Sequence, residues 1–291
     1  MLKKFLIAVI VTVLMLSRQI AVAAADNYDW SKAPRLGNIV EFARYIENER
    51  RAGQTTFRVV LTSKSILPNV WSSMTLDKND LVRIVPCRDF DAINAYIEDS
   101  EMRLSFSVVE YPGTRVANAY LSENKTQAWR TLTDEEQQLY NIAVDIVNEA
   151  SKCPSEREKA LYIHNAICGR MKEYVAKNER NKTAVGALVD GYAQCQGFSD
   201  AFYMLGRMSG LNVGRLFGEA DGIAHVWNWI TFEDGKSYCV DVTNDFVNKF
   251  DVLFCVDRKT LENDIHFTDK GNSHTEKTGF WCEWDIIPNM Q

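Results

Sequence analysis

The spacing of apolar residues alternates between a helical and an extended period along the chain. Near the N-terminus, Ile39, Phe42 and Ile46 recur at the spacing of an amphipathic helix, and the segment TFRVVLT is rich in the β-branched residues of a strand. The turn sequence YPGT predicts a hairpin between two further strands. In chain order, this small α+β region is predicted to contain a helix, a strand, a second helix and the two hairpin strands, at residues 38–53, 56–62, 89–100, 103–111 and 115–121.

Two capping sequences and a change of period organise the rest of the chain. Thr133 stands three residues before Glu136, and Ser155 three before Glu158, so a helix is predicted to begin at each capping box. The apolar spacing of FSDAFYMLGRM predicts a third helix that ends at Gly210. Beyond it, β-branched and aromatic residues concentrate in four short segments, LNVGRLFGEA, HVWNWITF, KSYCVDVT and FDVLFCVD. Helices followed by short strands are typical of an α+β fold with an antiparallel sheet.

The first residues have the pattern of an export signal. Lys3 and Lys4 precede an apolar run of 12 residues, and small residues follow up to Ala25. A membrane span needs roughly 20 apolar residues. We therefore expect cleavage between Ala25 and Asp26 and an exported protein, secreted, periplasmic or on the cell surface, with no membrane span; an uncleaved anchor is the alternative. The predicted organisation is a signal peptide, a small N-terminal α+β domain and a larger second domain, at residues 1–25, 26–125 and 126–291.

The charge of the chain argues against two classes of partner. Removing the signal takes away three basic residues and no acid, so the formal charge changes from −6 to −9. A chain this acidic is not expected to bind nucleic acid or anionic lipid. Apart from the isolated pair Cys153 and Cys168, no Cys and His residues have metal-ligand spacing, so we predict no metal and no cofactor. The oligomeric state is left open.

Cys195 is the cysteine best placed to react. Seven cysteines are present, and an odd number leaves at least one thiol unpaired even where disulfides form. In the segment GYAQCQGFSDAF, Cys195 stands where the third helix is predicted to begin. Unpaired N–H groups and the helix dipole favour a thiolate there and can hold an oxyanion. The alternative is a small apolar residue without a chemical role.

A reactive thiolate needs a base, and the chain has four histidines. His225 opens the strand-like segment HVWNWITF, where packing can hold the ring while it reaches a cleft. We expect His164 to lie at the surface or boundary of its helix, His274 to be solvated and His266 to be structural. His225 is therefore the predicted base.

Asp241, in the β-branched segment KSYCVDVT, is the predicted partner of His225, because an acid in such a segment needs a reason to be there. A two-residue Asp-Gly turn would place the two side chains on opposite faces of the hairpin. A three-residue loop over residues 233–235 instead sets Asp241 opposite Trp227, on the face that carries His225. Gly235 suits the left-handed position of that loop, so we predict the three-residue form.

These three residues predict a catalytic triad for acyl transfer. Cys195 would attack a carbonyl carbon, His225 would carry the proton to and from sulfur and the leaving group, and Asp241 would fix the imidazole tautomer. The backbone N–H of Cys195 would help to hold the oxyanion.

Three further residues are candidates for lining the substrate cleft. Gln194 adjoins the nucleophile, and Trp227 and Trp229 alternate with Asn228 along the predicted strand. The alternative for the two tryptophans is a place in the core of the sheet.

The segments GALVDGYAQCQGFSDAF and GEADGIAHVWNWITFEDGKSYCVDVTND resemble the transglutaminase-like superfamily of papain-fold proteins. In that family a Cys at a helix start, a His in an H-A-W-N-like strand and an Asp in a V-D-x-T-like strand form the triad, which implies Cys195, His225 and Asp241 here. The resemblance covers residues 133–267 and implies a Cys-bearing helix packed on an antiparallel sheet, while residues 30–125 resemble the variable N-terminal region of exported bacterial members.

Four positions depart from the family pattern. Phe198 and Ser199 stand where Tyr-Ala is usual, Val226 replaces the common Ala, and Asn244 replaces a frequent Trp. The first three resemble packing changes, whereas the change at Asn244 bears on the shape of the cleft and hence on the substrate class.

The triad is compatible with three functions. The first is a thiol hydrolase acting on peptide or amide bonds through a thioester, with a protein, a peptide or a cell-wall peptide as substrate. The second is a protein-glutamine transglutaminase, in which an amine accepts the acyl group. The third is a non-catalytic module that binds a peptide or glycan on the same fold.

Overall fold

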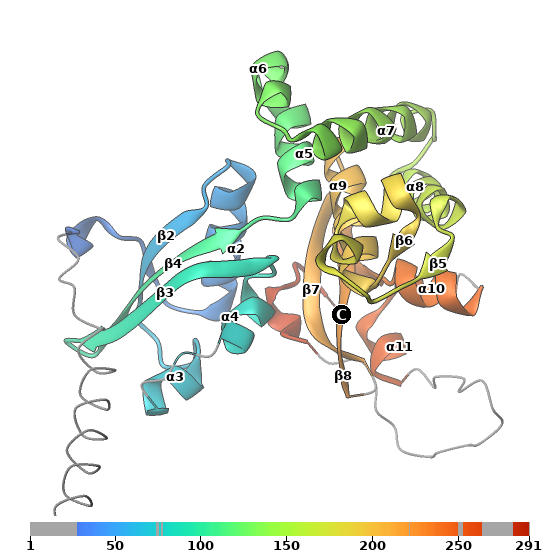
Figure 1. Cartoon of the computed structure of the whole chain (residues 1–291). Helices are drawn as coiled ribbons and strands as arrows, with labels where there is room; N and C mark the ends of the chain where they lie inside the picture. Colours follow the sequence, from blue (N-terminus) through green and yellow to red (C-terminus); the bar gives the residue numbers. More distant parts are fainter. Residues whose placement is uncertain are drawn as a thin grey trace, which may run out of the picture.

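The computed structural model describes residues 28–73, 76, 78–220, 222–249, 253–263 and 282–290. The predicted signal peptide, its cleavage point between Ala25 and Asp26, His266 and His274 lie outside these residues. Among the helices that are described, none is both long and apolar enough to cross a lipid bilayer. The chain forms an N-terminal unit beside a larger core (Figure 1).

The N-terminal unit is an antiparallel sheet, extended by one short parallel strand, with helices packed on one face (Figure 1). Its elements are a 3-10 helix (Trp30–Lys32), β1 (Arg35–Leu36), α2 (Ile39–Arg51), β2 (Thr56–Leu61), α3 (Pro68–Ser73), α4 (Lys78–Ile84), β3 (Asp89–Glu98) and β4 (Glu101–Val109). Within the described residues the strand order is β1-β2-β4-β3. Phe42 and Ile46 of α2 pack against alternate residues of β2 and β4, so the predicted first helix and first strand are confirmed.

Residues 89–98 form the strand β3, and the helix predicted over residues 89–100 is wrong. The apolar residues of this segment, spaced as on a helix, lie on an edge strand that is only partly buried. Asp99 and Ser100 both have positive φ, 50° and 65°, and make the tight turn that pairs β3 with β4. Residues 89–98 pair along the whole length of β4, whose burial alternates strongly from residue to residue. This long-range pairing outweighs the helical spacing of the apolar residues within the segment.

The second hairpin strand predicted at residues 115–121 is also wrong, because residues 112–121 form the helix α5. Pro112 occupies the first turn of α5, where its missing N–H costs nothing and its fixed φ suits the helix. The YPGT sequence therefore starts a helix instead of a turn. Only the first of the two predicted hairpin strands, now β4, is confirmed.

The core contains helices from the middle of the chain and a sheet from its C-terminal part (Figure 1). Its elements are α5 (Pro112–Leu121), α6 (Lys125–Arg130), α7 (Asp134–Ala150), α8 (Glu156–Arg170), β5 (Glu173–Tyr174), a 3-10 helix (Glu179–Lys182), a π-helix (Gly186–Asp190), β6 (Tyr192–Ala193), α9 (Cys195–Met208), β7 (Asn212–Ala220), β8 (Ile223–Thr231), β9 (Ser237–Val240), α10 (Val242–Asn248), β10 (Phe254–Val256), α11 (Arg258–Asn263) and a 3-10 helix (Trp284–Ile286). Within the described residues the main sheet has the antiparallel order β10-β9-β8-β7.

The helices of the core begin where the capping sequences predict. Thr133 and Glu136 form a reciprocal capping box at the start of α7, and the Ser155 hydroxyl accepts the N–H of Glu158 at the start of α8. The four predicted strands after residue 210 are confirmed as β7 to β10. The helix α9 is almost entirely buried between α5, α7 and α8 on one side and the sheet on the other. The fold is thus α+β, with a Cys-bearing helix packed on an antiparallel sheet.

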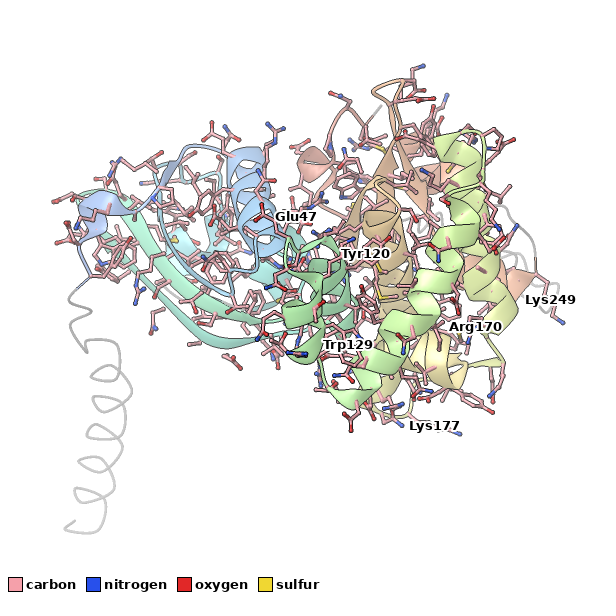
Figure 2. All side chains as sticks on the ribbon, turned by 90° about the horizontal axis from the view of Figure 1, so that it is seen from above. Glu47, Tyr120, Trp129, Arg170, Lys177 and Lys249 are labelled. Carbon is pink, nitrogen blue, oxygen red and sulfur yellow. The ribbon has the colours of Figure 1, made fainter. Side chains whose placement is uncertain are left out.

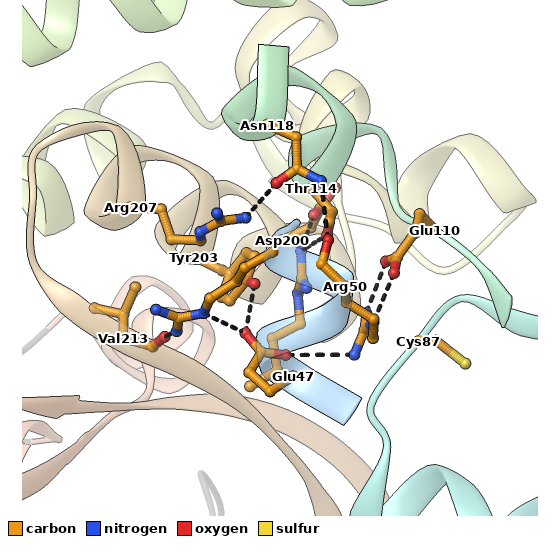
Figure 3. Close-up of polar contacts among 12 residues, drawn as sticks. Glu47, Arg50, Cys87, Glu110, Thr114, Asn118, Asp200, Tyr203, Arg207 and Val213 are labelled. Atoms are coloured by element: carbon orange, nitrogen blue, oxygen red, sulfur yellow. Dashed lines mark hydrogen bonds and ion pairs between the residues drawn. The ribbon is translucent and has the colours of Figure 1, made fainter. Parts of the chain in front are cut away.

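A polar network joins the N-terminal unit to the core at Glu47 of α2 (Figures 2 and 3). The Glu47 carboxylate accepts a hydrogen bond of 2.7 Å from the Tyr203 hydroxyl of α9 and one of 2.9 Å from Arg51. Arg51 also donates to the carbonyl oxygen of Val213 in β7, at 2.6 Å. Arg50 lies behind them in a two-pronged ion pair with Glu110, at 2.6 and 2.7 Å. The helix that carries Cys195 is therefore tied to α2, while a domain division at residue 125 stays a prediction.

Candidate active site

Cys195 is the first residue of α9, in agreement with the sequence. Gln194 before it is extended and makes no side-chain cap. Its carbonyl oxygen accepts the Gly197 N–H at 2.8 Å, so the N–H groups of Cys195 and Gln196 are the ones at the helix end where the thiol stands. Gly197 allows this end to lie close to a neighbouring loop, because an added Cβ would meet the Asn181 carbonyl oxygen at 2.6 Å. The Gln194 N–H donates to the same oxygen at 2.9 Å and fixes the start of the helix.

Cys195 differs from the buried cysteines in its surroundings. Burial raises the pKa of Cys87 and of Cys255 to about 12, and it also raises the pKa of Cys239. These thiols stay protonated at neutral pH. Cys195 is half-buried, is a free cysteine and lies close enough to His225 to favour the charged form of the imidazole.

The predicted three-residue hairpin loop between β8 and β9 is confirmed. The Phe232 N–H donates to the Lys236 carbonyl oxygen at 3.1 Å, and Gly235 has a φ of 76°. The pairing of Trp229 with Cys239 continues this register, which sets residue 241 opposite Trp227.

The hairpin brings His225 and Asp241 together. His225 Nε2 lies 2.7 Å from Asp241 Oδ2, and the two side chains are 13% and 1% exposed. With Nε2 committed to the carboxylate, Nδ1 is the ring nitrogen left for the thiol of Cys195. The indole of Trp227 stacks on the imidazole, with centroids 5.8 Å apart and planes 19° apart, and this contact limits rotation of the ring.

The surroundings of His225 favour the charged imidazolium. Burial opposes the charge, but the Asp241 carboxylate outweighs it through charge and a hydrogen bond, and Cys195 adds to the effect. Together they raise the pKa of His225 from 6.5 to about 10. At neutral pH the ring is therefore protonated.

Asp241 caps α10 instead of lying inside a strand, because β9 ends at Val240. The carboxylate accepts the N–H groups of Thr243 and Asn244 on Oδ1, each at 3.1 Å, and the Asn244 side-chain amide on Oδ2 at 2.9 Å. Burial would raise the pKa of Asp241, but the charge and hydrogen bond of His225 and the bonds from Asn244 lower it. Asp241 is therefore held as an anion in a defined orientation.

Tyr174 lies near the candidate site and is not predicted from the sequence. It ends β5, pairs with Ala193 of β6 and is exposed. Burial and then the charges of Cys195 and Asp241 raise the pKa of its hydroxyl, which stays protonated as a hydrogen-bond donor. A lone tyrosine 21 residues before the cysteine in a two-residue strand carries no local signal.

Residues 143–242 match the family model of the transglutaminase-like superfamily. Residues 143–242 form a transglutaminase-like domain. The matched segment contains Cys195, His225 and Asp241. A comparison with curated proteins found no match to this chain.

Three solved structures are similar to the chain at low identity. A transglutaminase (TGase) crystal structure shares 13% identity at a TM-score of 0.35, with 85% of this chain and 65% of that chain covered. A candidate cysteine protease from Cytophaga hutchinsonii shares 14% identity at a TM-score of 0.33, with 52% and 61% covered. A candidate protease from Parabacteroides distasonis shares 8% identity at a TM-score of 0.28, with 64% and 40% covered. The chain spans less than two thirds of the length of each.

The predicted cleft residues have different places in the transglutaminase-like domain. Gln194 is half-buried beside Cys195, and its amide contacts Gln196 at 3.4 Å. Trp227 and Trp229 are only 1% and 8% exposed and lie in the apolar cluster on one face of the sheet. Both are thus core aromatics, the alternative left open by the sequence, and Trp227 also touches the site through His225, so a place in the cleft wall stays a prediction.

The departures from the family pattern have structural explanations. Phe198 is buried against Phe246 of α10, with ring centroids 5.4 Å apart. Ser199 donates to the Trp227 carbonyl oxygen at 3.2 Å and so joins α9 to β8. Val226 is buried, and Asn244 binds the Asp241 carboxylate.

Proposed function

We propose that the transglutaminase-like domain is a cysteine-dependent acyl-transfer enzyme that hydrolyses peptide or amide bonds through a thioester. The observation that carries this proposal is the connected series of Asp241, His225 and Cys195, with the thiol at the start of a helix. The half-buried position of Cys195 lets water reach a thioester formed there, which favours hydrolysis.

The reaction requires two proton transfers through one imidazole. The Cys195 thiolate attacks the carbonyl carbon, the oxyanion forms, and the His225 imidazolium gives its proton to the leaving amine as the C–N bond breaks. Neutral His225 then removes a proton from water, which attacks the thioester and releases the acid and the thiolate. Asp241 keeps the ring oriented and stabilises its charged form. The Cys195 N–H and the Tyr174 hydroxyl are our candidates for the oxyanion donors.

We propose that the enzyme is exported and acts on a protein, a peptide or a cell-wall peptide. The support is the basic and apolar pattern of the first 25 residues together with the acidic charge of the remainder. The same thioester would give transamidation if an amine replaced water, so the acceptor has to be tested separately.

The experiment measures iodoacetamide alkylation of Cys195 across pH, read by mass spectrometry of the Cys195 peptide. In the unchanged protein we expect half-maximal rate well below about 8.5, the ordinary pKa of a cysteine thiol. His225→Ala is expected to move this pH up towards 8.5. Cys153→Ala, which removes a half-buried thiol outside the site, is expected to change nothing. If Cys195 reacts like an ordinary thiol and His225→Ala has no effect, the domain is a binding module instead.

A second assay separates the two acyl acceptors. The protein is incubated with a glutamine-containing substrate protein, which supplies the acyl group, and with a dansylated amine, and deamidation and dansyl incorporation are both measured. We expect acid formation that depends on Cys195 and little dansyl label. Predominant dansyl incorporation would make the enzyme a transglutaminase.

A further inference from the structure

A second His–Asp pair lies next to the first. His164 Nε2 of α8 is 3.0 Å from Asp245 Oδ2 of α10, and both side chains are completely buried. His164 is predicted from the sequence to lie at the surface or boundary of its helix, and this prediction is wrong because the residue is 0% exposed in the core. The ring is also held at Nδ1, which lies 3.0 Å from Asn165 Oδ1, and edge-on against Phe254 at 5.3 Å.

Asp245 is connected to Asp241 by two routes. One helical turn separates them on α10, and the Asp245 N–H donates to the Asp241 carbonyl oxygen at 3.2 Å. Asp245 Oδ1 accepts the Leu253 N–H at 2.8 Å, and the Leu253 carbonyl oxygen accepts the Asp241 N–H at 3.0 Å. Both backbone polar groups of Asp241 are thus held by groups that depend on Asp245.

The pair also sets the angle at which α10 leaves the sheet. α10 is a short helix, and an isolated helix of this length has little stability of its own. Its contacts to α8 and to residue 253 therefore determine where its first turn lies. That turn supplies the Thr243 and Asn244 N–H groups that orient the Asp241 carboxylate.

We infer that His164 and Asp245 are positioning residues for the triad carboxylate. The inference rests on the proposed function, because it assigns the pair an effect on the His225 imidazolium through Asp241. The pair locks α10 to α8, the locked turn holds Asp241 at 2.7 Å from His225, and the held carboxylate keeps the imidazolium charged beside Cys195. Neither residue touches the substrate.

The test compares His164→Leu with His164→Gln in the Cys195 alkylation assay. Leucine removes the contact with Asp245 and leaves that buried carboxylate without its histidine partner. The first turn of α10 is then no longer locked to α8, so Asp241 is expected to lose its fixed orientation. Alkylation at pH 6 should fall at least tenfold, and the pH of half-maximal rate should rise towards about 8.5. Glutamine can place a donor where Nε2 stands, so it should restore the rate to within threefold. Tyr162→Leu, on the exposed side of the same helix, is the matched control and should leave the curve unchanged.

Circular dichroism and thermal unfolding decide whether each variant is folded. If His164→Leu does not fold, Asp245→Asn carries the test, because it keeps an acceptor for the Leu253 N–H while replacing the carboxylate that faces His164. We then expect the alkylation rate of Cys195 at pH 6 to fall at least threefold, and the pH of half-maximal rate to rise. An unchanged curve in a folded variant overturns the inference.

The two proposals fail in different ways. If the unchanged protein shows an ordinary thiol and no dependence on His225, the proposed function fails. If alkylation is activated and depends on His225, yet the folded His164 or Asp245 variants behave like the unchanged protein, only the positioning inference fails.

Discussion

Replacing Glu47 with glutamine is expected to destabilise the protein in a pH-dependent way. Burial opposes ionisation of Glu47, but the charges of Arg50 and Arg51 and hydrogen bonds from Tyr203 and Arg51 outweigh it and lower the pKa from 4.5 to about 2 (Figure 3). One pKa unit corresponds to about 1.4 kcal/mol, so the ionised carboxylate stabilises the fold by at most about 3.5 kcal/mol at pH 7. Because a quarter of the side chain stays exposed, solvent screens the charges and we expect about 2 kcal/mol.

The sign of the pH dependence follows from the lowered pKa. Between pH 4.5 and 2 the unfolded chain binds a proton at Glu47 that the folded chain does not, so this stabilisation is complete above pH 4.5 and is lost as the pH falls through about 2. Urea unfolding of Glu47→Gln and the unchanged protein should therefore differ by about 2 kcal/mol at pH 7 and by progressively less at pH 4 and pH 3. Glu49→Gln, which removes the same charge two residues away on α2, is the control and should cost less than about 0.5 kcal/mol at any of these pH values. If the difference in the free energy of unfolding stayed constant or grew as the pH fell, the proposed role of the Glu47 charge between α2 and the core would be refuted.

Two further substitutions test the packing and capping of the core. Gly113→Ala should destabilise the protein by about 2 kcal/mol or more in thermal unfolding, because an added Cβ would lie 2.4 Å from Asp200 Oδ1. Gly169→Ala is the matched control. It lies in a helix with nothing within 4 Å of the added Cβ, so it should be neutral or stabilising by up to about 1 kcal/mol. Thr133→Ala should cost about 1 kcal/mol in urea unfolding, because it removes the hydroxyl that accepts the Glu136 N–H at the start of α7; no loss of stability would contradict the capping role.

The sequence predicts those elements whose boundaries are set by nearby residues. Thr133 and Ser155 open helices because their side chains bond to N–H groups three residues ahead. The loop at residues 233–235 is predicted because Gly235 adopts a positive φ more readily than other residues. In each case the physical cause lies within four residues of the element.

The errors arise where a distant partner decides between two local possibilities. The apolar spacing at residues 89–98 fits a helix, but pairing with β4 makes this segment a strand. Pro112 suits both a turn and the first position of a helix, and contact of the following residue with Asp200 favours the helix: the Gly113 N–H donates to that carboxylate at 3.0 Å. No pattern within the segment itself carries this information.

The candidate site divides along the same line. Cys195 and Asp241 are predictable because each stands at the start of a helix, where unpaired backbone groups favour a polar residue, and His225 is predictable as the histidine near the start of the strand β8. His164 is not predictable, because a histidine in an amphipathic helix can face either way and its direction depends on Asp245, 81 residues later. The residues expected to perform the chemistry can therefore be recognised from the sequence around them. His164, which is proposed to position them, acts through packing across the core and cannot be recognised in this way. It follows that a substitution at His164 should alter the reactivity of Cys195 even though none of the residues around the thiol is substituted.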